Sequence, residues 1–181
     1  MVTLLNIFKN QTKRLASLFL LILLPLISSN ISAHETAQPV TAPIAPIAPA
    51  WQLKTQSGEV ISSTQFQGQA IILHFWATWC PYCKRLQPKL VELEKQYQDQ
   101  GVKIVAISFN EDDGALPQDE IASRGYNFIT AVNGDEVAMR YGVKGTPTTF
   151  FINKDNQVIF KSTSSDISDP RLELAVKEIV K

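Results

Sequence analysis

The sequence has few residues that can ligate a metal or act as a nucleophile: two cysteines and two histidines among 181 residues. A closed zinc site needs four ligands. Such a set would have to combine both cysteines with His74 and the distant His34. Copper carriage would call for a histidine after the cysteines, and none follows them. We therefore predict no metal site, and a metal-carrying module is kept as an alternative function of another class.

Runs of basic residues are also missing. The chain has 17 Lys and Arg against 17 Asp and Glu, and residues 1–33 hold three of the basic residues and none of the acidic ones. The remainder therefore has a net charge of about −3. A mildly acidic surface without basic clusters argues against nucleic acid as a partner. The acidic residues 110–114 lack the downstream Glu of an EF-hand loop, so we expect a solvated turn there.

The N-terminal apolar run, residues 15–27, is too short to span a bilayer comfortably. Basic residues precede this run, and small residues after it lead to a candidate cleavage site behind Ala33. This order is typical of a secretory signal peptide over residues 1–33. An uncleaved N-terminal membrane anchor is the alternative. We expect an exported protein, periplasmic or otherwise outside the reducing cytosol.

Residues 34–50 are rich in proline and alanine and repeat the sequence Pro-Ile-Ala. Proline cannot continue a helix or a central strand. We therefore predict an extended linker over residues 34–50, followed by one folded domain over residues 51–181.

The domain sequence alternates between strand and helix patterns. Residues 70–76 are almost continuously apolar, which indicates a strand buried on both faces of an α/β sheet. The expected order is a hairpin over 51–61, strand 70–76, a helix from Cys80, strand 102–109, an αβα insertion over 117–141, a hairpin over 148–161 and a last helix capped by Asp169. The sequence therefore predicts the α/β class: a mixed central sheet with helices on both faces, an N-terminal hairpin and a central αβ insertion.

Both cysteines lie in the sequence Cys80-Pro81-Tyr82-Cys83, between the buried strand and the next helix. A cysteine at a helix start lies near free backbone N–H groups and the positive end of the helix dipole. We therefore expect the pKa of Cys80 to lie below that of an ordinary thiol. Cys80, the more exposed of the two by position, is the expected nucleophile, and Cys83 the resolving thiol. A structural disulfide is the alternative, but it would close a loop of only four residues and stabilise little.

Two separated segments resemble a known family. Residues 75–83 (Phe-Trp-Ala-Thr-Trp-Cys-Pro-Tyr-Cys) and 141–149 (Tyr-Gly-Val-Lys-Gly-Thr-Pro-Thr-Thr) resemble the active-site and cis-proline segments of the thioredoxin superfamily, in its exported TlpA/ResA-like branch. Pro88 falls where family members kink the active-site helix. The resemblance covers residues 51–181. It implies the thioredoxin fold, a redox-active Cys80–Cys83 disulfide as the only cofactor, and a cis-Pro147 facing that disulfide.

Four further residues are candidates for binding a protein substrate. Trp79 and Tyr82 flank the cysteines and offer an apolar platform for a partner. In the family reading, the backbone of Thr146 beside Pro147 would pair with an extended substrate peptide.

Two positions depart from the family pattern and concern redox tuning. His74 stands where thioredoxin keeps a buried aspartate, and Pro81-Tyr82 differs from the dipeptides often found in this branch. His74 is either a hydrogen-bonded core histidine or a proton acceptor for Cys83.

The resemblance implies an exported oxidoreductase that exchanges its dithiol with cysteine-containing proteins. A membrane thiol reductase of the DsbD kind would keep the pair reduced. Apocytochrome c before haem attachment is one implied substrate, so cytochrome c maturation is the implied process. The departures at His74 and Tyr82 leave a disulfide oxidant or isomerase of the same fold as an alternative. A client-binding module is the alternative from another class.

Overall fold

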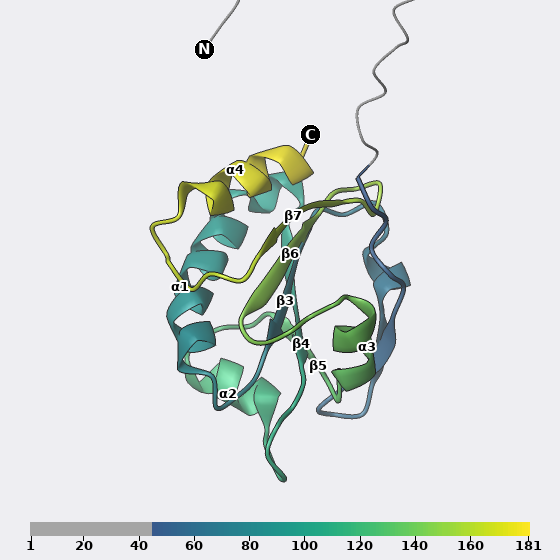
Figure 1. The fold of residues 1–181 in the computed structure, drawn as a ribbon, viewed down its shortest axis with the longest axis vertical. Helices are drawn as coiled ribbons and strands as arrows, with labels where there is room; N and C mark the ends of the chain where they lie inside the picture. Colours follow the sequence, from purple (N-terminus) through teal and green to yellow (C-terminus); the bar gives the residue numbers. More distant parts are fainter. Residues whose placement is uncertain (1–44) are drawn as a thin grey trace, which may run out of the picture. The chain divides into compact units, whose positions relative to one another are not determined.

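The structure is a computed structural model that describes residues 45–181 (Figure 1). The predicted signal peptide, residues 1–33, and linker residues 34–44 lie outside the described residues. In chain order the elements are β1 (Gln52–Thr55), β2 (Val60–Ser62), η1 (Ser63–Phe66), β3 (Ile71–Trp76), α1 (Pro81–Gln96), η2 (Gln98–Gln100), β4 (Lys103–Ser108), α2 (Pro117–Ser123), β5 (Ile129–Val132), α3 (Asp135–Arg140), β6 (Thr148–Ile152), β7 (Val158–Ser162) and α4 (Pro170–Ile179). None of the helices in residues 45–181 has the length and apolarity needed to cross a membrane.

One mixed sheet runs through the described domain, with the strand order β2-β1-β5-β4-β3-β6-β7. The strand β3, which precedes the cysteine pair, lies between parallel β4 and antiparallel β6. The strands β4 and β5 are also parallel, and the remaining pairs are antiparallel. The predicted α/β class with a mixed central sheet is therefore confirmed.

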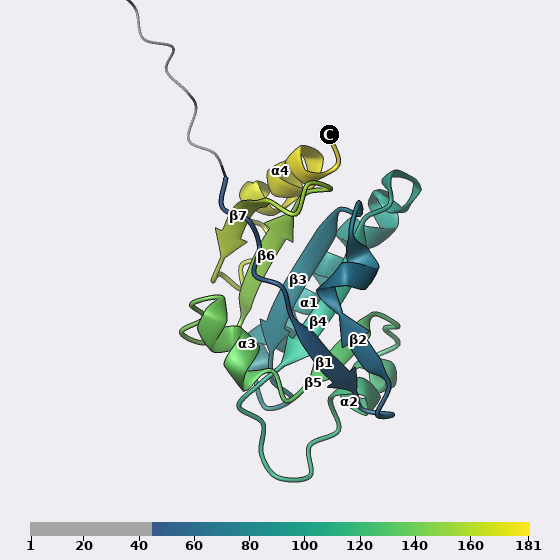
Figure 2. The ribbon, with the colours of Figure 1, turned by 90° about the vertical axis from the view of Figure 1, so that its right-hand side faces the viewer.

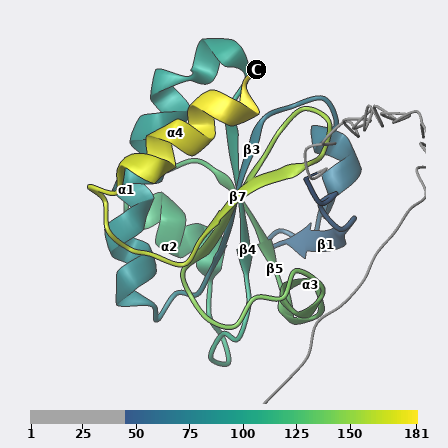
Figure 3. The same cartoon turned by 45° about the horizontal axis from the view of Figure 1, so that its top comes forward.

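Helices cover both faces of the sheet, as predicted. Figure 3 shows α1, α2 and α4 on one side of the strands and α3 on the other. Side chains alternate along β3. Accordingly, Ile72 and Trp76 belong to the core cluster that includes α1 and α4, whereas Leu73 and Phe75 belong to the cluster that includes α3. The cysteine pair joins the first of these clusters.

The helix α1 carries the site and is held by a stripe of leucines. Leu86, Leu90 and Leu93 recur at helical spacing and are buried against the sheet. Pro88 lies inside the helix, which nevertheless continues to Gln96. A break at this position would have moved the leucine stripe out of register, so packing against the sheet outweighs the lost hydrogen bond of the proline.

The end of the predicted linker packs on the domain. The Ala48 N–H donates to Asn156 O (2.8 Å), the Val158 N–H donates to Pro46 O (2.8 Å), and Ala48 is buried. Figure 2 shows this segment passing from β7 toward β1. The sequence placed these residues in the linker because of their prolines. An extended Pro-Ile-Ala segment can still pair at a sheet edge, since only its non-proline residues need donate.

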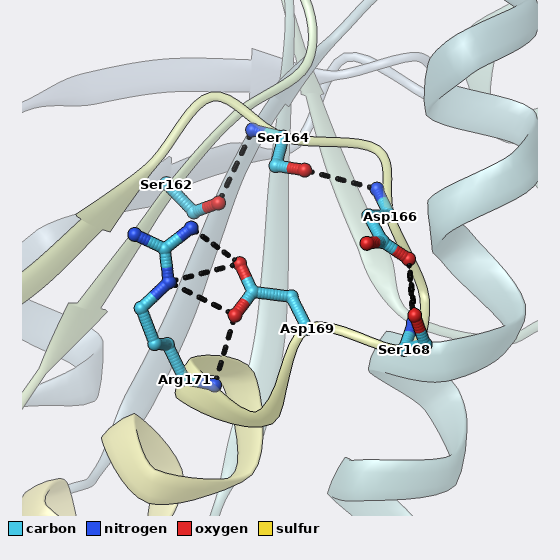
Figure 4. Close-up of polar contacts among 6 residues, drawn as sticks. All are labelled: Ser162, Ser164, Asp166, Ser168, Asp169 and Arg171. Carbon is cyan, nitrogen blue, oxygen red and sulfur yellow. Dashed lines mark hydrogen bonds and ion pairs between the residues drawn. The ribbon is translucent and has the colours of Figure 1, made fainter.

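The loop before α4 shows how its predicted start is made (Figure 4). Asp169 is the N-cap, and its carboxylate accepts from the Arg171 N–H at 3.0 Å and from the Arg171 guanidinium at 2.7 Å. Upstream, the Asp166 carboxylate accepts from the N–H and hydroxyl of Ser168. These bonds hold the pKa of both carboxyl groups below the usual range, the hydrogen bonds being the main cause. The predicted N-cap Asp169 is confirmed.

Candidate active site

Cys80 and Cys83 form a disulfide at the N-terminus of α1. Cys80 is the N-cap residue and Pro81 occupies the first turn. The Cys83 N–H donates to the Cys80 sulfur at 3.1 Å. A sulfur that accepts a helix N–H is placed where negative charge is favoured. This is the sulfur that the sequence predicts to be the nucleophile.

Accessibility does not separate the two sulfurs in the disulfide form. Cys80 is 1% exposed and Cys83 is fully buried, whereas the sequence suggested that Cys80 would be the more exposed. The Cys80 sulfur turns inward to bond Cys83 and to accept its N–H, so the helix cap itself buries it. The expected roles of Cys80 as nucleophile and Cys83 as resolving thiol therefore depend on their positions along α1.

The cis-proline segment lies at the same end of the sheet as the cysteines. The Thr146–Pro147 peptide bond is cis, as the resemblance implied. Phe75 on β3 pairs with Thr148 on β6, so the residues just beyond each of them meet at one edge. The Thr148 hydroxyl donates to Gly145 O at 2.7 Å and closes this loop. The backbone N–H and C=O of Thr146 make no hydrogen bond with another described residue.

A cleft of about 350 Å³ joins the segment before Cys80 to the segment before Pro147. Its lining includes Trp79, Met139, Val143, Lys144, Gly145 and Thr146. Trp79 is 47% exposed and Tyr82 is 55% exposed, so both aromatic side chains next to the cysteines are open to a partner. Trp76 is fully buried in the core, as expected. The structure thus brings Trp79 and Thr146 together, and Tyr82 lies on the surface of α1.

His74 is fully buried on β3, on the α1 side of the sheet. Its Nδ1 lies 3.0 Å from the Thr149 hydroxyl oxygen, on the neighbouring strand β6. Its Nε2 has no hydrogen-bond partner among the described residues. Burial lowers the pKa of His74 to about 3, so the imidazole is neutral near pH 7. In a neutral imidazole one ring nitrogen donates a hydrogen bond and the other accepts one.

Charges next to the pair are partly neutralised by the insertion. The Lys84 ammonium, one residue after Cys83, pairs with Glu120 on α2 at 2.8 Å. The Arg124 guanidinium donates to Lys84 O at 2.7 Å. The central insertion is therefore bonded to the first turns of α1, a contact that no local sequence pattern indicates.

Two residues near the site were missed by the sequence analysis. Gln87, one turn beyond Cys83, is fully buried, and neither atom of its amide has a partner among the described residues. Glu111 belongs to the segment predicted to be a solvated turn, yet its carboxylate accepts three hydrogen bonds from Thr78. The only available signal for Glu111 was its place just after a strand parallel to β3.

The fold and the site define a class of protein. A mixed sheet flanked by helices, with a Cys-x-x-Cys disulfide at the start of the helix after β3, is the arrangement of a thiol–disulfide oxidoreductase with the thioredoxin fold. Residues 44–161 match the model of the AhpC/TSA family, and the chain belongs to this family.

Individual relatives agree with this assignment. The thiol-disulfide oxidoreductase ResA of Geobacillus thermodenitrificans is 33% identical over 152 residues, which cover 83% of this chain and 86% of that protein. The ResA of Bacillus subtilis is 34% identical over 113 residues, 62% of this chain and 63% of that protein. The crystal structure of a thiol:disulfide interchange protein from Chlorobium tepidum superposes with a TM-score of 0.66 at 25% identity, over 78% of this chain and all of that one. The TlpA/ResA-like assignment is therefore confirmed.

Proposed function

We propose that this enzyme is an exported disulfide reductase that transfers electrons from its Cys80–Cys83 dithiol to cysteine-containing proteins. The observation that carries the proposal is the Cys80 sulfur at the helix start, accepting the Cys83 N–H at 3.1 Å beside the Trp79–Thr146 cleft. The ResA relatives support the reductase direction. The basic and apolar pattern of residues 1–33 supports export.

The exchange proceeds in two balanced steps. The Cys80 thiolate attacks one sulfur of the substrate disulfide, forms a mixed disulfide and releases the other substrate sulfur as a thiolate. The Cys83 thiolate then attacks the Cys80 sulfur, closes the enzyme disulfide and releases the second substrate sulfur. Two electrons pass to the substrate, and the released thiolates take up protons according to their pKa values. No cofactor besides the cysteine pair is required.

The substrate peptide would lie along the cleft beside Pro147. The N–H and C=O of Thr146, which have no partner within residues 45–181, suit an extended peptide that adds as a short strand. Pro147 has no N–H of its own, and Trp79 and Tyr82 supply apolar contact area on either side of Cys80.

Of the two roles expected for His74, its contacts support the hydrogen-bonded core histidine. Its Nδ1 lies 3.0 Å from the Thr149 hydroxyl oxygen, and burial lowers its pKa to about 3. An imidazole with so low a pKa is a poor acceptor for the proton of a thiol, so no proton transfer is assigned to His74.

The electron donor in this proposal is a membrane thiol reductase of the DsbD kind, and the process is cytochrome c maturation. The haem-attachment sequence Cys-x-x-Cys-His supplies the disulfide to be reduced. An oxidant or isomerase remains the second candidate, because His74 is buried and neutral where thioredoxin has a carboxylate. Equilibration with glutathione separates the two directions. A reduction potential of about −270 mV supports a reductant, and one of about −120 mV contradicts the reductase direction.

Trapping tests the chemistry with a defined substrate. The probe is a synthetic peptide that carries Cys-x-x-Cys-His as an intramolecular disulfide. The reduced Cys83→Ser variant should accumulate a mixed disulfide with this peptide, visible on a non-reducing gel and by mass. The matched Cys80→Ser variant should form none. Equal adducts from both variants would contradict the assigned roles.

A further inference from the structure

The loop that carries Cys80 is fastened to the loop after β4. Both of the N–H contacts of Thr78 with the Glu111 carboxylate oxygens measure 3.0 Å, and the Thr78 hydroxyl donates to the same carboxylate at 2.6 Å. Within the first loop, the Cys80 N–H donates to Ala77 O at 3.1 Å, so Thr78 lies in the turn that ends at the cysteine. Glu111 thus fixes the turn from which Cys80 projects.

A second set of bonds ties the same region to α3. The Trp79 indole N–H donates to Asn110 O at 2.8 Å, and the Asn110 N–H donates to the Asp135 carboxylate at 2.9 Å. Asn110 adopts a φ of 51°, in the left-handed region that asparagine tolerates better than most residues besides glycine. The two bonds of Asn110 therefore join the Trp79 side chain to α3 through the loop after β4.

Glu111 also brings a charge close to the reactive sulfur. Two peptide units separate Thr78 from Cys80, so their Cα atoms lie at most about 7.6 Å apart. The half-buried Glu111 carboxylate is bonded to Thr78, two residues before Cys80, so its charge lies beside the turn and is screened less than a fully exposed charge. The helix N-terminus stabilises the Cys80 thiolate, whereas the negative charge of Glu111 destabilises it.

Six other charged side chains lie near the cysteine pair. They are Lys84 and Arg85 on α1, Glu120 and Arg124 on α2, Asp135 on α3, and Lys144 in the loop before Pro147. Lys84 is paired with Glu120, and Arg85 lies over the Tyr82 ring. Unlike these six groups, Glu111 is hydrogen-bonded to the turn that precedes Cys80.

We infer that Glu111 is a positioning residue that holds the Cys80 turn and restrains the thiolate of Cys80 by its negative charge. Because a less stable thiolate makes the dithiol a better electron donor, Glu111 biases the cysteine pair toward reduction of its partners. This inference rests on the proposed function for its biological meaning, but its effect is defined at Cys80 itself.

The test compares Glu111→Gln with Asp112→Asn in the full protein. The two variants remove the same charge at neighbouring positions, and Asp112 is exposed and has no side-chain bond to Thr78. The readout is the rate of alkylation of reduced Cys80 by iodoacetamide between pH 4 and 9, followed by peptide mass. We expect Glu111→Gln to react roughly threefold faster than the wild type on the acid limb, with the midpoint moved to lower pH. Asp112→Asn should follow the wild-type profile.

A third variant separates charge from loop position. Thr78→Val removes the hydroxyl bond and keeps the Glu111 charge, so its alkylation midpoint should stay that of the wild type. The inference is overturned if Glu111→Gln leaves the midpoint unchanged, even with a lowered Tm, or if Thr78→Val shifts it equally. At equilibrium with glutathione, the ratio of dithiol to disulfide should be roughly threefold higher in Glu111→Gln than in the wild type. These outcomes do not depend on any substrate, so they can fail while the trapping experiment succeeds, and the reverse.

Discussion

The two faces of the sheet bury different kinds of side chain. The face toward α3 is lined by apolar residues, namely Ile71, Leu73, Phe75, Val105, Ile107, Ala131, Phe150 and Ile152, and the one buried threonine of its strands within residues 45–181, Thr148, has its hydroxyl bonded to Gly145 O. The face toward α1 and α4 also holds fully buried polar residues, namely His74, Gln87, Ser108, Thr130 and Thr149. The strand pairing places them together, since His74 lies opposite both Thr149 and Ala106, and Ala106 lies opposite Thr130.

Several polar atoms on the α1 face have no partner among the described residues. They are His74 Nε2, Trp76 Nε1, both atoms of the Gln87 amide, and the Ser108 and Thr130 hydroxyls. A buried polar group without a hydrogen bond costs about 1–3 kcal/mol. The cost falls on the face that contains the cysteine pair. We infer that the α1 face, which also holds many of the largest buried apolar side chains, carries a cost in stability beneath the reactive sulfurs that the α3 face lacks.

The largest expected effect is on the apolar face. Phe75 is fully buried and packs against Tyr141 and Phe150, with ring centroids 5.3 and 5.7 Å away. Phe75→Ala should lower the free energy of unfolding by about 3–5 kcal/mol, because it leaves a cavity. Urea denaturation of the oxidised protein measures this. Leu174→Ala, at an exposed position on α4, should change it by less than about 0.5 kcal/mol. Similar losses in both variants would contradict the packing of Phe75 in the core of the α3 face.

The next effect concerns His74 and pH. Its native pKa is lowered to about 3, whereas the unfolded chain takes up the proton below about pH 6.5. Only the unfolded state gains a proton between these values, so stability falls as the pH falls. Between pH 7 and pH 5 this one group should cost about 2 kcal/mol. The free energy of unfolding of His74→Asn should therefore fall by about 2 kcal/mol less than that of the wild type between pH 7 and pH 5. Equal losses in both proteins would mean that native His74 takes up its proton as readily as the unfolded chain does, against the lowered pKa.

A smaller effect of opposite sign is expected at Gln87. Gln87→Met keeps the volume and removes two unpartnered polar atoms, so the free energy of unfolding should stay the same or rise by about 1 kcal/mol. Gln96→Met makes the same change at an exposed position of α1 and should have almost no effect. A loss above about 1 kcal/mol in Gln87→Met would show that the amide is hydrogen-bonded in solution, and the polar face would then be less costly than inferred.

The smallest effect is expected where the insertion meets α1. The Lys84–Glu120 pair is about one-third exposed on both sides, so its coupling energy should be below about 1 kcal/mol. A double-mutant cycle with Lys84→Met and Glu120→Gln measures this coupling in urea denaturation. A larger coupling would mean that α2 contributes to the stability of the catalytic helix through this pair.

Much of the fold and of the site could be predicted because it depends on local patterns. The apolar run before the cysteines identified β3, the leucine spacing identified α1, and Asp169 with Pro170 identified the start of α4. Cys80 and Cys83 were found by their spacing, and Pro147 was found through the family resemblance. These residues carry their signal within a few neighbours along the chain.

The missed features depend on residues far apart in the chain. Glu111 meets Thr78 across 33 positions, and Arg124 meets Lys84 across 40. Pro46 and Ala48 form backbone hydrogen bonds with Val158 and Asn156, more than 100 positions later in the chain. Nothing in the local sequence separates Glu111 from the other acidic residues of its loop, because its partner Thr78 comes next to it only in the folded domain.

The sequence by itself determined the class of fold, the cysteine pair and its place at a helix start, because periodicity, caps and the Cys-x-x-Cys spacing act over a few residues. The tertiary structure alone decided which carboxylate lies next to the Cys80 turn, that His74 is buried and neutral, and that Trp79 and Thr146 share one cleft. Burial and contacts between distant segments arise only when the strands are ordered in the sheet. The reactivity of a sulfur depends on those contacts.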